Sequence, residues 1–158
     1  MKQFFLAAIV VCIFASFWAP YSSSEAAECG KDVSPLIFSK DISNVLFVVS
    51  GTLDPDEAKA LDISSIKSDI QSSLRDAGIQ CELTETRETI TGDRFLKIHI
   101  YGILLERRVY FCSVAVIQRR QQQEEDCTVR EYSDVTSQIG NIRSQVRALM
   151  SDLLEYVH

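Results

Sequence analysis

The stretch RFLKIHIYGILLERRVYFCSVAVIQ, residues 94–118, decides the fold that we expect for this chain of 158 residues. Two long apolar runs stand on either side of a short charged break at residues 106–108. Both runs are rich in β-branched and aromatic residues, which favour strands, and the charged break suits a reversal of the chain. The stretch therefore predicts a β-hairpin at the centre of a sheet.

Both faces of this hairpin are apolar, because side chains alternate across a strand. One face is expected to carry most of the aliphatic residues: Leu96, Ile98, Ile100, Leu104, Tyr110, Cys112, Val114 and Val116. The opposite face carries the residues that we regard as candidate binding residues: Phe95, Tyr101, Ile103, Val109 and Phe111.

The sequence before the hairpin predicts a strand and a helix. Residues 44–50 include five consecutive apolar residues, which indicate a strand that is buried on both faces. A helix is expected over residues 54–77, since Asp54 can cap its start and Glu57 can reach back to the cap. An interruption at Asp62, which separates the first turns from the rest, is the alternative. Gly78 then ends this helix in the left-handed conformation.

Further strands and a second helix are expected around the hairpin. Residues 79–84 alternate between apolar and polar side chains, which predicts a strand, and residues 127–132 predict a short fifth strand. A long helix is expected to begin at Ser133 or Asp134 and to run to Val157. Each of the two helices carries one narrow apolar stripe.

These elements predict an α+β two-layer sandwich, in which two amphipathic helices pack on a mixed or antiparallel sheet of four or five strands. The expected order is β-α-β-β-β-(β)-α. If both helices cover the same face, the face of Phe95, Tyr101 and Phe111 stays bare and can dock a partner. The alternatives are one helix on each face, or an N-terminal arm folded over the second face.

The first residues have the layout of a secretory signal peptide, with an unbroken apolar run over residues 4–19 after a singly positive start. A membrane span usually needs about 20 apolar residues, so an uncleaved anchor is the alternative. We expect cleavage after Ala26. The chain then divides into a signal peptide at residues 1–26, an N-terminal arm at residues 27–42 and one α+β domain at residues 43–158. We expect a periplasmic or extracellular protein.

The charge balance argues against nucleic acid as a partner. The chain has 16 basic and 22 acidic residues, and removal of Lys2 and Glu25 with the leader leaves 15 and 21, so the net charge stays −6. Contact with phosphates needs a basic surface, which this composition does not offer.

Four cysteines remain in the expected mature chain: Cys29, Cys81, Cys112 and Cys127. An even number in an exported domain suggests disulfides, and the wide spacing does not match a zinc site, which uses close pairs. Of the three possible pairings we favour Cys29–Cys81 with Cys112–Cys127. One bridge with two buried thiols is the alternative.

The sequence lacks a phosphate-binding loop, a zinc-protease motif, a calcium loop and a nucleophile elbow. We therefore expect a protein that is not an enzyme and that has no cofactor and no metal. His99 lies within a strand, and Cys112 has no basic neighbour that would lower the pKa of its thiol, so both suit packing better than catalysis. A small hydrolase or thiol enzyme near these two residues is the alternative.

An export signal is followed by a strand at residues 45–51, a helix that ends in LRDAGI at residues 74–79, strands up to Val116 and a helix to Val157. This layout resembles the lipopolysaccharide-assembly lipoprotein family and its relatives over most of the mature chain. The resemblance is one of pattern, so no functional residue is carried over. The chain departs from the family because no small residue directly precedes Cys29, as a lipidation signal requires.

We therefore expect an exported, non-enzymatic binding or assembly protein of the bacterial cell envelope, which docks its partner through an apolar sheet face or edge. A protein partner or self-association is expected, and a lipid-like ligand is an alternative. A further alternative is a secreted effector or inhibitor that acts through the polar tip at residues 119–126.

Overall fold

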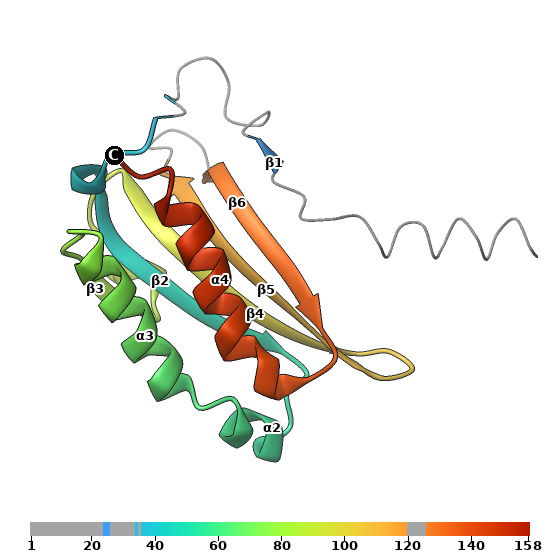
Figure 1. Cartoon of the computed structure of the whole chain (residues 1–158). Coiled ribbons are helices and arrows are strands. Elements are labelled where there is room, and N and C mark those ends of the chain that lie inside the picture. Colours follow the sequence, from blue (N-terminus) through green and yellow to red (C-terminus); the bar gives the residue numbers. More distant parts are fainter. Residues whose placement is uncertain (1–23, 26–33, 35, 120–125) are drawn as a thin grey trace, which may run out of the picture.

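Figure 1 shows the computed structural model of the chain, which describes residues 24–25, 34, 36–119 and 126–158. One sheet contains the strands β1 (Ser24–Glu25), β2 (Ile42–Gly51), β3 (Glu82–Thr84), β4 (Arg94–Leu104), β5 (Arg108–Gln118) and β6 (Cys127–Thr136). Their order across the sheet is β1-β6-β5-β4-β2-β3. Strand β2 runs parallel to β3 and β4, and the other pairs are antiparallel. The predicted α+β class and mixed sheet are confirmed.

The predicted central hairpin is also confirmed. Strands β4 and β5 pair without a break from Arg94 opposite Gln118 to Leu104 opposite Arg108. This register places Ile98 opposite Val114, and both side chains are fully buried in the larger of two apolar clusters. The hairpin therefore forms the middle of the sheet, as its composition indicates.

The helices are α2 (Pro55–Ala60), α3 (Ile63–Asp76) and α4 (Ile142–Leu154). Helices α3 and α4 lie side by side on the same face of the sheet (Figure 1). Their stripes and the strands below them supply large fully buried side chains, among them Ile66, Ile70, Leu96, Ile98, Ile142 and Leu149. The alternative of one helix on each face is therefore wrong. No helix among the described residues is long and apolar enough to cross a membrane.

The helix expected at residues 54–77 is divided at Asp62, where the sequence allows a break, and forms two helices. Asp62 adopts the left-handed conformation with φ 45°, and its side chain caps α3 by accepting from the Ser65 N–H at 3.3 Å. The start of α2 is as predicted, because the Glu57 N–H donates to Asp54 Oδ1 at 2.8 Å and the Asp54 N–H donates to Glu57 Oε2 at 2.9 Å. Two local caps thus hold two short helices in place of one long helix.

The end of α3 follows the prediction from Gly78, which has φ 75°. The Ile79 N–H donates to the Leu74 carbonyl at 2.8 Å, and the Gly78 N–H donates to the Arg75 carbonyl at 2.9 Å. These two bonds define a Schellman ending, which removes Ile79 from the strand expected at residues 79–84. The observed strand β3 begins at Glu82.

The start of the last helix differs from the prediction. Strand β6 continues to Thr136, with Asp134 opposite Cys112 and Thr136 opposite Tyr110, so Ser133 and Asp134 are strand residues and do not cap a helix. Helix α4 begins at Ile142 after a 3-10 turn. Backbone pairing with β5 outweighs the local capping preference of these side chains.

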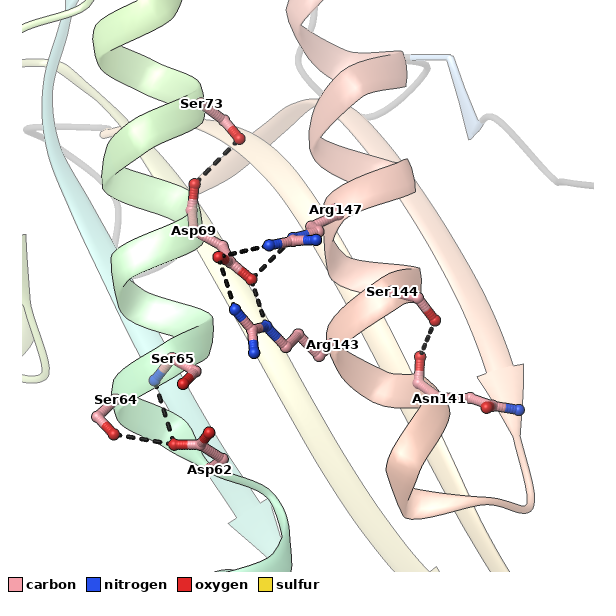
Figure 2. A network of polar contacts seen from close by, with 9 residues as sticks. All are labelled: Asp62, Ser64, Ser65, Asp69, Ser73, Asn141, Arg143, Ser144 and Arg147. Atoms are coloured by element: carbon pink, nitrogen blue, oxygen red, sulfur yellow. Dashed lines mark hydrogen bonds and ion pairs between the residues drawn. The ribbon is translucent and has the colours of Figure 1, made fainter.

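One carboxylate joins the two long helices, as Figure 2 shows. Asp69 on α3 accepts hydrogen bonds from Arg143 at 2.5 and 3.0 Å and from Arg147 at 2.8 and 2.7 Å, both on α4. The hydrogen bonds from Arg143, and to a smaller extent those from Arg147, hold the pKa of Asp69 well below its usual value of 3.8. This cluster fixes α3 against α4 on the solvent side, above the apolar contact.

The described part of the N-terminal arm packs with the C-terminus. Ile37 is buried in the core beneath the helices and forms a parallel bridge with Val157. The Ser39 N–H donates to the His158 carbonyl, and the His158 N–H donates to the Ile37 carbonyl, each at 2.9 Å. Residues 36–42 therefore do not cover the second face of the sheet.

Candidate docking face of the sheet

The face opposite α3 and α4, which we term the helix-free face, divides into two halves. At one end, a second apolar cluster contains Leu46, Ile90, Phe95, Ala115 and Ile117. Phe95 is only 1% exposed, and Ile90 reaches it from the segment between β3 and β4. Burial of this kind makes Phe95 a core residue that a partner cannot contact, which corrects its placement among exposed binding residues.

An ion pair lies at the same end of the helix-free face. Arg87 Nη2 stands 2.7 Å from Asp126 Oδ2, and both residues line a shallow groove beside Phe95 and Lys97. The segment that carries Arg87 and Ile90 thus acts as the cover for this half. No periodic pattern in the sequence predicts such a cover, because its residues form a short irregular connection.

The other end of the face has no comparable cover among the described residues. Tyr101 on β4, Phe111 on β5 and Val135 on β6 lie directly opposite one another and are 36%, 42% and 46% exposed. The rings of Tyr101 and Phe111 are 6.4 Å apart and tilted by 41°. We call these three residues the exposed row. Two of them are predicted candidates, and the structure brings them together.

The apolar surface continues toward the β4–β5 turn. Ile103 and Val109, both predicted candidates, form the next pair along the hairpin and are partly buried. Leu104 and Leu105 at the turn are 58% and 60% exposed. Apolar side chains in such number at one end of a sheet are unusual for a surface that meets only water.

Sequence reasoning missed Val135 as a member of this surface. The expected strand ended at residue 132, and Val135 was assigned to the final helix, whereas β6 runs to Thr136. The alternation of Glu131, Ser133 and Val135 on the helix-free face is the signal that could have revealed it.

His99 is the titratable side chain next to the exposed row. Its Nε2 atom is 2.7 Å from Ser50 Oγ, and its ring centroid is 6.1 Å from that of Tyr101. Burial, and to a smaller extent the nearby charge of Lys97, lower the pKa of His99, whereas the charge of Glu131 has a smaller opposite effect. The ring is therefore neutral at pH 7. In the described part of the chain no carboxylate hydrogen-bonds this ring, so the orienting third member of a catalytic triad is missing.

Cys112 lies on the other face of the sheet from His99. The register pairs Cys112 with Ile100, and its side chain is fully buried beneath the helices. Burial, and to a smaller extent the charge of Asp134, raise the pKa of the Cys112 thiol to about 12. A thiol in this state is not a nucleophile, and the sheet separates it from the imidazole, so the two residues cannot form one thiol-enzyme site.

The favoured disulfide pairing is wrong. Cys81 and Cys112 are free thiols, one partly buried and one buried, so neither Cys29–Cys81 nor Cys112–Cys127 forms. Cys127 is disulfide-bonded, and its partner lies outside the described residues, as does Cys29. The described residues also contain no group of three or more His, Cys, Asp or Glu side chains that could hold a metal ion.

Comparison with known proteins supports a fold likeness only. No protein-family model matches the chain, and no curated protein matches it. Among solved structures, the PelC dodecamer from Paraburkholderia phytofirmans is 12% identical with a TM-score of 0.49, over 85% of this chain and 96% of that chain. A single-substitution variant of that dodecamer is also 12% identical, with a TM-score of 0.47 over 85% and 92% of the two chains.

Proposed function

We propose that this chain is an exported, non-enzymatic binding or assembly protein of the bacterial cell envelope, which docks a protein partner through the exposed row. The observation that carries the proposal is the placement of α3 and α4 on one face, which leaves Tyr101, Phe111 and Val135 in contact with solvent. Exposed contiguous apolar surface commonly marks a protein interaction site. Export rests on the leader at residues 4–19.

The chemistry of the exposed row favours a protein over other occupants. Tyr and Phe give large contact area with few rotatable bonds, which is typical of residues that dominate protein interfaces. The row lies on the sheet surface beside Ser50 and His99, which hydrogen-bond to each other, so the polar groups next to the aromatic rings already have a partner. A lipid-like ligand usually occupies a concave apolar pocket, and none of the four best-formed cavities among the described residues is lined by the row.

A photo-crosslinking experiment tests this function. A photoreactive phenylalanine analogue is incorporated at position 111 or 135 of the full-length protein. Cells are irradiated, and the proteins of the envelope fraction are then separated by mass. Leu36 is the matched control position, because it is apolar and 52% exposed but its carbonyl accepts from Arg94 Nη1, at the opposite end of β4 from Tyr101. We expect discrete protein adducts from positions 111 and 135 and none from position 36.

Three crosslinking results contradict the proposal. Equal adduct patterns from all three positions, or no protein adduct from the row, show that the row is ordinary surface. Lipid adducts alone at positions 111 and 135 assign the face to a lipid-like ligand. Cell fractionation of the same samples tests export separately, and a cytoplasmic protein with an intact leader contradicts the envelope location.

A further inference from the structure

The outer edge of β6 is a long strand edge with little cover. Strand β6 pairs with β5 along one side, and on its other side the described residues place only the two-residue strand β1, at Arg130 and Glu131. A strand edge presents N–H and C=O groups that can accept another strand. The antiparallel pairing of β1 shows that a strand can lie along this edge at Arg130 and Glu131 (Figure 1).

Strand β1 belongs to the segment that leaves with the signal peptide in the proposed function. Ser24 and Glu25 precede the expected cleavage site after Ala26, so the exported chain lacks β1, and no described strand then pairs with the outer side of β6 at Arg130 and Glu131. The other edge of the sheet is shorter, since β3 has only three residues and the part of β2 beyond its pairing with β3 is residues 47–51. Export therefore uncovers the longer edge of the sheet.

The sequence of β6 is complementary to itself in the antiparallel direction. Residues 130–134 read REYSD, with a basic residue at one end, an acidic residue at the other and Tyr132 in the middle. When two copies align with Tyr132 opposite Tyr132, Arg130 of each copy faces Asp134 of the other, and Glu131 faces Ser133. Residues that lie opposite each other share a face, so each Arg130–Asp134 pair lies on the helix side.

This register is the one that the charges favour. A slide of two residues in one direction places the two Glu131 side chains opposite each other, and like charges in that position are destabilising. A slide of two residues in the other direction places Arg130 opposite Thr136, so the charge pair is lost. Registers offset by one residue put helix-side residues opposite residues of the helix-free face, which separates the two layers.

Both charged groups are held in place at the edge. The Arg130 guanidinium carbon lies 3.5 Å from the centre of the Tyr156 ring, and Arg130 Nε donates to the Tyr132 hydroxyl at 2.8 Å. Asp134 Oδ2 accepts from Gln145 Nε2 at 2.9 Å, which fixes the carboxylate. An arginine has five N–H donors and a carboxylate about four acceptor positions, so each group can make further bonds across an interface.

We infer that the exported chain forms a two-fold dimer, in which the β6 strands of two copies pair antiparallel with Tyr132 at the symmetry axis. The two sheets then form one continuous sheet, with the helices of both copies on one side and both exposed rows on the other. The inference rests on the export that the proposed function includes. It also adds an oligomeric state to that function, because the docking face then spans two subunits.

Engineered cysteines test the register. Two variants of the full-length protein are produced separately, one with Glu131→Cys and one with Ser133→Cys. Each exported chain is purified, and its intact mass identifies its N-terminus. Opposite residues in an antiparallel pair have Cα atoms about 4.5–5.5 Å apart, within the range of a disulfide. Two thiols at position 131 stand diagonally, at about 7–8 Å. We expect oxidation of the mixed preparations to give at least tenfold more covalent dimer than either preparation alone.

A charge exchange tests the pairing energetics without cysteines. Arg130→Asp and Asp134→Arg are each expected to weaken the dimer at least tenfold by light scattering across a concentration series, and the double variant is expected to regain most of that loss. Circular dichroism checks that each variant is folded. Phe111→Ser is the matched control on the exposed row, and it leaves this dimer intact even where it removes the partner adducts of the proposed function.

Three results overturn the inference. One is a cleaved chain that stays monomeric at about 100 times the concentration used for crosslinking. Another is a pattern in which mixed and single cysteine preparations crosslink equally. The third is an exported chain that keeps Ser24 and Glu25, because β1 then still occupies the edge. None of these results bears on the crosslinks from the exposed row, so failure of the dimer is distinguishable from failure of the proposed docking function.

Discussion

Alanine in place of Phe95 and of Phe111, one at a time, separates the two halves of the helix-free face. Both residues are phenylalanines in adjacent strands on the same face, but Phe95 is 1% exposed and Phe111 is 42% exposed. Removal of a fully buried phenylalanine costs about 3–5 kcal/mol, since it leaves a cavity in addition to the lost transfer free energy. A ring that leaves about half of its surface in water contributes roughly half of a full burial, about 1–1.5 kcal/mol.

Urea unfolding followed by circular dichroism measures both changes. We expect Phe95→Ala to lower the free energy of unfolding by at least about 2 kcal/mol more than Phe111→Ala does. The dye-binding apolar surface of the native protein is expected to fall only in Phe111→Ala. Similar losses of stability in the two variants would falsify the division of the face into a covered and an exposed half, because Phe111 would then be buried in the native state.

Three further predictions follow from the structure. Asp69→Asn is expected to lower the free energy of unfolding at pH 7, and the difference from the parent chain shrinks as the pH falls below about 4, as urea midpoints at pH 7 and pH 3 measure. The reason is that folding lowers the pKa of Asp69, so its contribution is complete above the pKa of the unfolded state and absent below the pKa of the folded state. Under native conditions at pH 8, iodoacetamide is expected to leave Cys112 unmodified, and rapid labelling of Cys112 contradicts its burial. Peptide mapping without reductant is expected to find Cys127 in a disulfide, for which Cys29 is the remaining cysteine of the expected mature chain. Gly51→Ala is expected to lower the free energy of unfolding by about 2–3 kcal/mol, because the added Cβ would lie 2.0 Å from the Gly102 carbonyl oxygen and the φ angle of +93° strains any other residue. A thermal midpoint equal to that of the parent chain refutes this.

Local signals predicted the elements whose stability is local. The capping box at Asp54 and the Schellman ending at Gly78 depend on residues within one or two turns, and both appear where expected. The central hairpin followed from its composition and its charged break. The start of the last helix was wrong, because Ser133 and Asp134 obtain backbone partners from β5, which is distant in the sequence.

The candidate site was predicted in part for the same reason. Alternation along the hairpin placed Tyr101 and Phe111 on one face, but it could not distinguish them from Phe95, since the cover over Phe95 comes from Ile90 in an irregular segment. The disulfide pairing failed likewise. Cysteine spacing does not reveal that Cys112 points into the core beneath α4 while Cys81 lies beside β3.

The sequence by itself determined the class of the fold, the central hairpin and the two apolar faces of that hairpin, because strand alternation and helix stripes are properties of neighbouring residues. Only the tertiary structure decided that both long helices share one face and that one half of the other face is covered. Those outcomes depend on which apolar surfaces meet, and each stripe could have packed on either face. The bare half, with Tyr101, Phe111 and Val135, is therefore a result of packing between distant segments.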